Sequence, residues 1–509
     1  MTGKCGNIPD NLYKPGEVII GGVFSLIQPE VYLLNFTVFP ERSNDAAIVK
    51  FKHYQHVLTL IFAIHEINDI PSLLPNITLG FHIFDNLFDL GRTDETILDL
   101  LFKQRKNTLN DKWDRKDVFS VIGGLTSEHS IQMATILSNY KIPQLTYGSF
   151  EATLSSKIDF PFVYRMAPRE TAHHMGIVQL LLHFRWTWIG LIVSDDDAGE
   201  SFVQKLIPLL VQNSICVAFL KRNAIKNLVL NNNNNEGLTR LTQTLLLTDA
   251  NVIILATDSV LLNSLTLFLE EFSMKALVGK VWIMPLQWYF STLPSGELVG
   301  RKIFYGALSF SVHTNSVPGF QDFLRNVKFD KTLKTFFCLF WQYAFQRCAN
   351  CRGEEKLEDL PANVFEMDMS GESYSIYNAI YAMAHALHAI YFSRKRPMLN
   401  KGKLEHGNIQ PWQLHSFMEN IHFNNGAVQE VLFENKELSI GYDIINWVTF
   451  PNQSFQKVLV GSVSSSKLFS IIKDAIVWNR RLKQIYSESR NSINRGFGHA
   501  EVKFLKGCV

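Results

Sequence analysis

The stretch Val121-Ile-Gly-Gly-Leu-Thr-Ser-Glu-His-Ser130 has the pattern that is most informative about the fold. Apolar residues lead into a Gly-Gly turn, and Thr126 or Ser127 after it can cap a helix. We therefore predict a strand, a tight turn and a helix. In an open α/β sheet this is the position where ligands bind, because the first N–H groups of the helix can donate hydrogen bonds to an anion. On these residues alone, an ordinary helix cap is the commoner explanation. They match neither a P-loop nor a dinucleotide-binding fingerprint.

Strand and helix patterns alternate on both sides of this turn. Such alternation is typical of parallel sheets covered by helices on both faces. Two successive blocks of it predict an α/β protein with two doubly wound lobes. The predicted strands are Val18–Leu26, Ile77–Ile83, Val118–Ile122, Gln144–Tyr147, Trp188–Val193, Cys216–Leu220, Val252–Leu255, Lys280–Met284, Val428–Phe433, Gly441–Val448 and Val458–Val463. The predicted helices are Val57–Ile67, Thr96–Phe102, Ser130–Leu137, Ala172–Leu182, Phe202–Val211, Leu238–Leu247, Val260–Phe272, Lys331–Phe345, Tyr374–Tyr391 and Trp412–Asn420.

The composition excludes several classes of protein. At 509 residues the chain is too long for one hydrophobic core, and 47% apolar against 19% charged residues excludes a disordered chain. The net charge of +2 gives no reason to expect nucleic acid as a partner. We identify neither a signal peptide at the N-terminus nor a run of about 20 apolar residues that would span a membrane. Ser375–Ser393 is uncharged, but its apolar residues repeat at helical spacing, which predicts a helix with one buried face.

The cysteines and the sequons give weaker signals. Cys348 and Cys351 form a Cys-x-x-Cys pair that fits a loop disulfide, free thiols or redox chemistry, and no second pair lies at zinc-site spacing. Candidate glycosylation sites are Asn35, Asn76 and Asn452.

We find no signature of an enzyme. The chain has no Gly-x-Ser-x-Gly elbow and no zincin motif. The acidic run Ser194-Asp-Asp-Asp197 fits either a hard cation site or a helix cap in a solvated turn. We therefore predict no catalytic residue, no metal site and no cofactor.

Several motifs resemble the bilobed ligand-binding domain of class C G-protein-coupled receptors. They are Glu66-Ile-Asn-Asp69, Gly80-Phe-His-Ile-Phe-Asp85, the glycine turn, and Ile142-Pro-Gln-Leu-Thr-Tyr-Gly-Ser-Phe150. Ser373-Tyr-Ser-Ile-Tyr-Asn378 and Gln410-Pro-Trp-Gln-Leu-His-Ser-Phe417 resemble the vomeronasal type-2 pheromone receptors in particular. The resemblance extends from about Leu12 to Trp478. It implies a periplasmic-binding-protein type I-like fold, the "Venus flytrap", in which two lobes close on a ligand.

The resemblance also implies domain boundaries. Residues 1–15 form an N-terminal segment, 16–167 with 311–429 form lobe 1, and 168–310 with 430–465 form lobe 2. Residues 466–509 are expected to be a tail that resembles a degenerate start of the family's cysteine-rich module. The hinge would lie near Ala167–Pro168, with the other crossings near Ser309–Ser311 and Val428–Glu430.

The family's ligand-binding residues match this chain in part. In amino-acid-binding relatives a serine at the position of Ser127 holds the ligand carboxylate, and an acid at the position of Glu170 holds the ammonium. Thr126 and Ser149 complete the polar side of the predicted site. Phe150, Ala198 and Leu286 replace a threonine, a tyrosine and an aspartate, which favours a larger or more apolar ligand over a free acidic amino acid. Cys5 matches the family's N-terminal cysteine, but residues 85–87 at its partner's position contain no cysteine.

The function that this resemblance implies is that of an extracellular receptor region. We expect part of a vomeronasal type-2 receptor that lacks the cysteine-rich and transmembrane parts. It would bind a small-molecule or peptide pheromone and form a homo- or heterodimer through lobe 1. Only the full-length receptor, in the plasma membrane, would engage a G protein. The alternative is a soluble, non-signalling binding protein of the same fold, and an enzyme of the doubly wound class rests on fold analogy alone.

Overall fold

The chain divides into two compact units, which we describe separately. The computed structural model describes residues 11–29, 47–104, 113–115, 118–149, 152–223, 236–257, 280–284, 303–326, 356–360, 365–395, 409–419, 421–434, 436–449, 455–464 and 468–478. Unit 1 comprises Met1–Glu170 and Thr314–Ile440, and unit 2 comprises Thr171–His313 and Gly441–Val509. Each unit has its own mixed sheet, so the predicted fold class, two α/β lobes, is confirmed.

The sheet of unit 1 is parallel at its centre. Its strand order is β1-β5-β2-β8-β9-β10-β18-β17-β16. The strands from β5 to β18 pair in parallel, and β1, β17 and β16 add antiparallel edges. Their bounds are β1 Asn11–Lys14, β2 Val18–Phe24, β5 Leu79–Asp85, β8 Val118–Gly123, β9 Gln144–Thr146, β10 Val163–Arg165, β16 His422–Asn424, β17 Glu430–Glu434 and β18 Glu437–Leu438.

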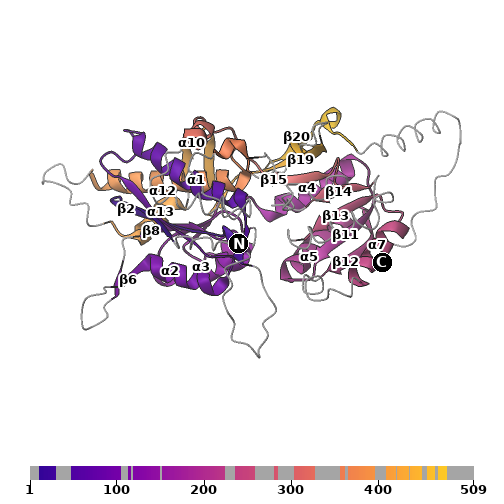
Figure 1. Ribbon diagram of the computed structural model, residues 1–509, viewed down its shortest axis with the longest axis horizontal. Helices are drawn as coiled ribbons and strands as arrows, with labels where there is room; N and C mark the ends of the chain where they lie inside the picture. The colour runs from indigo at the N-terminus through magenta and orange to yellow at the C-terminus, as the bar shows by residue number, and fades with distance from the viewer. Residues whose placement is uncertain are drawn as a thin grey trace, which may run out of the picture. The chain divides into compact units, whose positions relative to one another are not determined.

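Helices cover both faces of this sheet, as Figure 1 shows. Helices α2 (Leu90–Leu101) and α3 (Ser127–Asn139) pack on one face, where Leu100, Val121 and Met133 belong to one buried apolar cluster. On the other face lie α1 (Phe51–Asp69) and α12 (Gly371–Lys395), with α10 Phe320–Asn326 and α13 His415–Met418 beside them. The short strands β3 Ile27–Pro29, β4 Ala47–Val49, β6 Phe102–Gln104 and β7 Trp113–Arg115 form two separate pairs.

Helix α12 is buried on more than the one face that its apolar spacing predicts. Asn378 lies off the apolar stripe, yet it is fully buried and its Oδ1 accepts a hydrogen bond of 2.7 Å from Nδ2 of Asn425. The turn between β16 and β17, which contains Asn425, covers that side of the helix. Tyr377 and Tyr381 donate their hydroxyls to Oε2 of Glu66 on α1, at 2.7 and 2.8 Å. The sides of α12 that we expected to face solvent are therefore covered by other parts of unit 1, and polar side chains there form hydrogen bonds within the protein.

The sheet of unit 2 has the order β12-β11-β13-β14-β15-β19-β20-β21. The strands from β12 to β15 are parallel, and β19, β20 and β21 continue the sheet in antiparallel fashion. The strands are β11 Trp188–Ser194, β12 Cys216–Asn223, β13 Val252–Ala256, β14 Val281–Met284, β15 Leu308–Val312, β19 Tyr442–Thr449, β20 Phe455–Val463 and β21 Phe469–Ile471. The helices are α4 Glu170–His183, α5 Asp197–Gln212 and α7 Glu236–Leu247.

The unit boundaries differ from the predicted lobe boundaries, most clearly at the third crossing. The chain passes between units at 170/171, 313/314 and 440/441, where the sequence suggested 167/168, 310/311 and 429/430. The third boundary lies later because β17 pairs with β18, and β18 pairs with β10 inside the sheet of unit 1. Similarly, β21 lies in the segment predicted as a tail because it pairs with β20.

Other sequence predictions differ in detail or fall outside the described residues. The strands β1, β3, β4, β6, β7, β10, β15, β16, β18 and β21 and the helix α10 were not predicted. The predicted helix 412–420 is a 3-10 turn, Pro411–Leu414, followed by α13. The predicted helices 260–272 and 331–345 lie outside the described residues. None of the helices in the described part of the chain is long and apolar enough to cross a membrane.

Candidate functional site

The carboxyl ends of the central strands of unit 1 meet at one edge of the sheet. Strands β5, β2, β8, β9 and β10 are parallel neighbours, so the turns that follow them share that edge. Ligands of open α/β sheets bind at such edges. The predicted residues Thr126, Ser127 and Ser149 all lie in turns that follow β8 or β9.

The turn after β8 is built around Gly124 and a helix cap. Gly124 has φ +84, and a Cβ there would lie 2.2 Å from Oγ of Ser130, so glycine is required. Oγ1 of Thr126 caps α3 by accepting from the backbone N–H of His129 at 3.4 Å, and it lies 2.6 Å from Nδ1 of the same histidine. Helix α3 therefore begins at Ser127, and its first-turn N–H groups point out of its end without intrahelical acceptors.

The turn after β9 brings a second hydroxyl to the same place. Oγ of the buried Ser149 donates to Oγ of Ser127 at 3.0 Å. Gly148 packs on the backbone of the first turn, since a Cβ there would lie 2.3 Å from the carbonyl oxygen of Leu125. Oγ1 of Thr146 donates to the carbonyl of Gly124 at 3.0 Å. The two turns form one polar unit of two hydroxyls at the N-terminus of α3, where a negative charge is stabilised.

A buried aromatic layer lies next to these turns. The rings of His56 on α1 and Tyr147 meet edge to face at 5.1 Å, and the rings of His53 and His56 stack at 5.1 Å. Nδ1 of His53 donates to the carbonyl of Ser25 at 2.6 Å. Burial lowers the pKa of His53 to about 4 and holds the pKa of His56 well below its usual value. Both imidazoles are therefore neutral at pH 7, and this layer gives the edge an uncharged aromatic wall.

Asp85, the last residue of β5, is a buried acid at the same edge of the sheet. Its Oδ1 accepts the backbone N–H groups of Leu26 and Leu87, both at 3.0 Å. Burial raises the pKa of Asp85 to about 7, although these two hydrogen bonds act in the opposite direction. The sequence motifs assign no binding role to His53, His56 or Asp85. The available signal was the spacing of the two histidines, three residues apart on an otherwise apolar helix face.

The other predicted site residues lie on different elements. Glu170 is the first residue of α4 and is half-buried, whereas Ala198 is exposed in the first turn of α5 in unit 2. Phe150 and Leu286 lie outside the described residues. The acidic run before α5 acts as a cap, because Oδ1 of Asp196 accepts the N–H of Gly199 at 2.7 Å. In the part of the chain that the structure describes, no three His, Cys, Asp or Glu side chains are grouped to hold a metal ion.

Of the cysteines and the candidate glycosylation sites, some lie within the described residues and others lie outside them. Cys216, at the start of β12, is disulfide-bonded, and it is the one cysteine among the described residues, so its partner lies outside them. Cys5, Cys348 and Cys351 lie outside the described residues, as do Asn35 and Asn452. Asn76 is exposed in the loop between α1 and β5, with φ +65.

Comparison with known proteins identifies the same architecture. Residues 57–449 match the family model described as "Receptor family ligand binding region". The chain is 29% identical to mouse vomeronasal type-2 receptor 26 over 97% of its own length and 60% of that receptor. It is 25% identical to the human extracellular calcium-sensing receptor, covering 92% of this chain and 47% of the receptor. It is 27% identical to human taste receptor type 1 member 2, covering 88% of this chain and 52% of that receptor.

These relatives are class C G-protein-coupled receptors, the family that the sequence motifs resemble. The chain spans roughly half to three-fifths of their length, from 47% to 60% in these three comparisons.

Proposed function

Because this chain belongs to the family of receptor ligand-binding regions, which are not enzymes, we propose that it is the extracellular pheromone-binding region of a vomeronasal type-2 receptor. The match to a vomeronasal receptor over 97% of the chain supports this assignment. The disulfide at Cys216 supports it as well, since disulfides persist in oxidising compartments such as the cell exterior. The G protein and the plasma membrane would be engaged by the full-length receptor, as a dimer that forms through unit 1.

The ligand in this proposal has an amino-acid backbone, as a single residue or at the end of a peptide. The observation that supports it is the contact between Ser127 and Ser149 at the N-terminus of α3, 3.0 Å between hydroxyl oxygens. Those hydroxyls and the first-turn N–H groups suit a carboxylate. Glu170 would pair with the ammonium. Phe150 and Leu286 would favour an apolar side chain over that of glutamate.

Titration calorimetry on the purified, refolded chain tests this proposal, with a panel of free amino acids and short peptides. We expect Ser127→Ala to weaken binding by about 0.5–1.5 kcal/mol, the net value of one hydrogen bond. Glu170→Ala should cost more, about 3–5 kcal/mol, because it removes one partner of a desolvated ion pair. Glu95→Ala, an exposed acid on α2, is the control and should leave the affinity unchanged.

Equal affinities for the wild type and Glu170→Ala would show that the ligand binds without the proposed ammonium contact. Binding of glutamate in preference to apolar residues would contradict the proposed ligand class.

A further inference from the structure

Asp85 holds two turns at the edge of the unit 1 sheet where the candidate site lies. Its Oδ1 accepts the N–H of Leu26 in the turn after β2 and the N–H of Leu87 in the turn after β5, both at 3.0 Å. His53 binds the other side of the first turn, because its Nδ1 donates to the carbonyl of Ser25 at 2.6 Å. The peptide unit between Ser25 and Leu26 is thus held at both of its polar groups by buried side chains from α1 and β5.

The turn after β5 needs this support because two of its residues are strained. Leu87 has φ +54 and Phe88 has φ +55, in the left-handed region that is costly for residues with a side chain. The N–H of Leu87 donates to Asp85, and that of Phe88 donates to Oδ1 of Asn86 at 3.2 Å. Oγ of Ser25 donates to the same oxygen of Asn86 at 2.7 Å. Asp85 and Asn86 therefore hold the turn in a conformation that it would not keep alone.

The strained turn lies beside the start of α3. Strand β2 alone separates β5 from β8, so the carboxyl ends of β5 and β8 are about 10 Å apart. Burial lowers the pKa of His129 in the first turn of α3, and the charge of Glu128, the carbonyl of Phe88 and the charge of Asp89 act against this effect. A displacement of the turn after β5 would therefore change the surroundings of the N-terminus of α3.

The charge of Asp85 also reaches the turn that carries Ser149. Burial raises the pKa of Tyr147, two residues before Ser149, and the carboxylates of Glu372 and Asp85 raise it further. The hydroxyl of Tyr147 has no hydrogen-bond partner among the described residues, so no contact shields it from these charges. Asp85 is thus electrostatically coupled to the edge on which we place the ligand.

The hydrogen bonds of Asp85 are unevenly divided between its two oxygens. Oδ1 accepts two N–H groups, whereas Oδ2 is buried and has no hydrogen-bond partner among the described residues. This division suits a neutral carboxyl group, in which one oxygen accepts and the other carries the proton. A cavity of about 10 Å³ borders Asp85, which is about the space that one water molecule needs to exchange a proton with that oxygen.

Several other titratable or charged groups surround Asp85 and its neighbours, on or next to α1, α2, α3, α12 and the turn after β9. They are Lys50, Lys52, His53, His56, Asp89, Arg92, Glu128, His129, Tyr147 and Glu372. Burial lowers the pKa of the three histidines and raises that of Tyr147, so these four side chains are largely uncharged at pH 7. Burial raises the pKa of Asp85 to about 7, although nearby backbone N–H groups and Arg92 act in the opposite direction. Among the groups with a shifted pKa, Asp85 is the one that is half ionised near pH 7.

We propose that Asp85 is a positioning residue of the candidate site, which holds the turns after β2 and β5 and takes up a proton from solvent on Oδ2 when an anionic group binds at the start of α3. A negative charge favours the neutral form of a nearby carboxyl group. At about 10 Å and an effective dielectric constant of about 20, the repulsion between two carboxylates corresponds to about a tenfold change in an equilibrium constant. This linkage rests on the proposed binding of a carboxylate, whereas the holding of the turns and the titration of Asp85 do not.

Two variants of the full chain separate the holding of the turns from the charge. Asp85→Asn keeps an acceptor oxygen but cannot titrate, and Asp85→Ala removes both functions. In amide hydrogen exchange, Asp85→Ala should raise the rates at Leu26 and Leu87 about tenfold, whereas Asp85→Asn should leave them within about threefold of the wild type.

Urea denaturation at pH 6 and pH 8 tests the titration without a ligand, and it needs only Asp85→Asn. A carboxyl group whose pKa is raised in the folded state gives stability that is present at low pH and is lost as the pH rises through that pKa, here about 7. From pH 6 to pH 8 the folding equilibrium constant of the wild type should therefore fall about tenfold more than that of Asp85→Asn.

Titration calorimetry with phenylalanine at pH 6 and pH 8 tests the linkage. The wild type should bind phenylalanine about fivefold more tightly at pH 6 than at pH 8, and Asp85→Asn should lack this difference. A purely structural role of Asp85 would leave the pH profile of binding unchanged.

The matched control is Asp159→Asn, the same replacement at an exposed acid of unit 1, whose Oδ2 accepts from the hydroxyl of Ser156 at 2.7 Å. It should change none of these measurements by more than about twofold. Equal pH slopes of stability for the wild type and Asp85→Asn would overturn the titration, and unchanged exchange at Leu26 and Leu87 in folded Asp85→Ala would overturn the positioning role. Phenylalanine bound equally well at both pH values would overturn the linkage and keep the proposed ligand. No binding at either pH would refute the proposed ligand class together with the linkage, while the exchange and denaturation results would still decide the role of Asp85.

Discussion

The buried imidazoles of His53 and His56 make unit 1 sensitive to acid at the scale of single residues. Burial lowers both pKa values in the folded state, that of His53 to about 4, so the folded chain binds fewer protons than the unfolded chain below pH 6.5. Their contribution to stability is fully present above pH 6.5 and is lost as the pH falls towards the folded values. For each pH unit by which the pH falls in that range, such a histidine lowers the free energy of unfolding by up to about 1.4 kcal/mol.

His56→Phe isolates this effect, because the ring keeps its contact with Tyr147 and neither imidazole nitrogen of His56 has a hydrogen-bond partner among the described residues. Between pH 6.5 and 5 we expect the wild type to lose about 2 kcal/mol more stability than the variant. Urea denaturation at a series of pH values measures the difference. Identical pH slopes for wild type and His56→Phe would show that His56 titrates normally.

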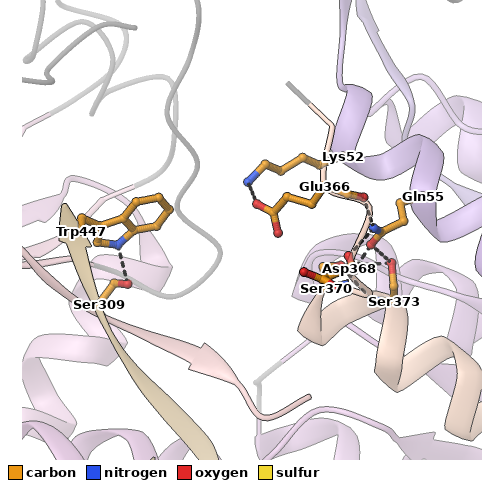
Figure 2. A network of polar contacts seen from close by, with 8 residues as sticks. All are labelled: Lys52, Gln55, Ser309, Glu366, Asp368, Ser370, Ser373 and Trp447. Carbon is orange, nitrogen blue, oxygen red and sulfur yellow. Dashed lines mark hydrogen bonds and ion pairs between the residues drawn. The ribbon is translucent and has the colours of Figure 1, made fainter. Parts of the chain in front are cut away.

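At the scale of elements, Gln55 joins α1 to the start of α12 (Figure 2). Its Nε2 donates to the carbonyls of Glu366 and Asp368, both at 2.7 Å. Its Oε1 accepts the backbone N–H of Ser370 at 2.9 Å and the hydroxyl of Ser373 at 2.7 Å. One amide thus satisfies the polar groups of a segment that has no strand or helix partner of its own. In unit 2, the indole N–H of Trp447 similarly donates to Oγ of Ser309 at 2.7 Å and ties β19 to β15.

Gln55→Leu should therefore destabilise unit 1 by at least about 3 kcal/mol. The replacement has similar volume, but it removes four hydrogen bonds, of which that from the hydroxyl of Ser373 is buried and the other three are partly buried. A buried group left without its partner costs about 1–3 kcal/mol. Chemical denaturation followed by tyrosine and tryptophan fluorescence measures the loss. Gln321→Leu removes two exposed hydrogen bonds, one donated to Asp368 and one accepted from Arg325, and should cost less than about 0.5 kcal/mol. A loss for Gln55→Leu no larger than that of this control would contradict the role of Gln55.

At the scale of the whole molecule, two units with separate sheets and three crossings suit a protein that closes on a ligand. To move the population from 1:99 to 99:1, a ligand must prefer the closed form by about 5.5 kcal/mol. We therefore expect the radius of gyration to fall when a binding ligand saturates the chain, as measured by small-angle scattering. Under the same conditions a non-binding amino acid should leave it unchanged. A constant radius with a ligand that calorimetry shows to be bound would contradict closure.

The sequence by itself determined the local pattern and the family. Periodicity predicted most of the central strands of both sheets, though not β10 or β15, and the Gly-Gly turn before Ser127 predicted the start of α3, because these patterns depend on neighbouring residues. The motifs around Glu66 and Ser373 pointed to the class C receptors.

The tertiary structure alone decided which distant residues meet. The hydroxyls of Ser127 and Ser149 touch because β8 and β9 are parallel neighbours. Glu437 reaches Arg165 because β18 joins the sheet of unit 1 beside β10, which also places the third crossing at 440/441. No local pattern encodes these contacts. They depend on strand order, which is set by the burial of apolar faces far apart in the sequence.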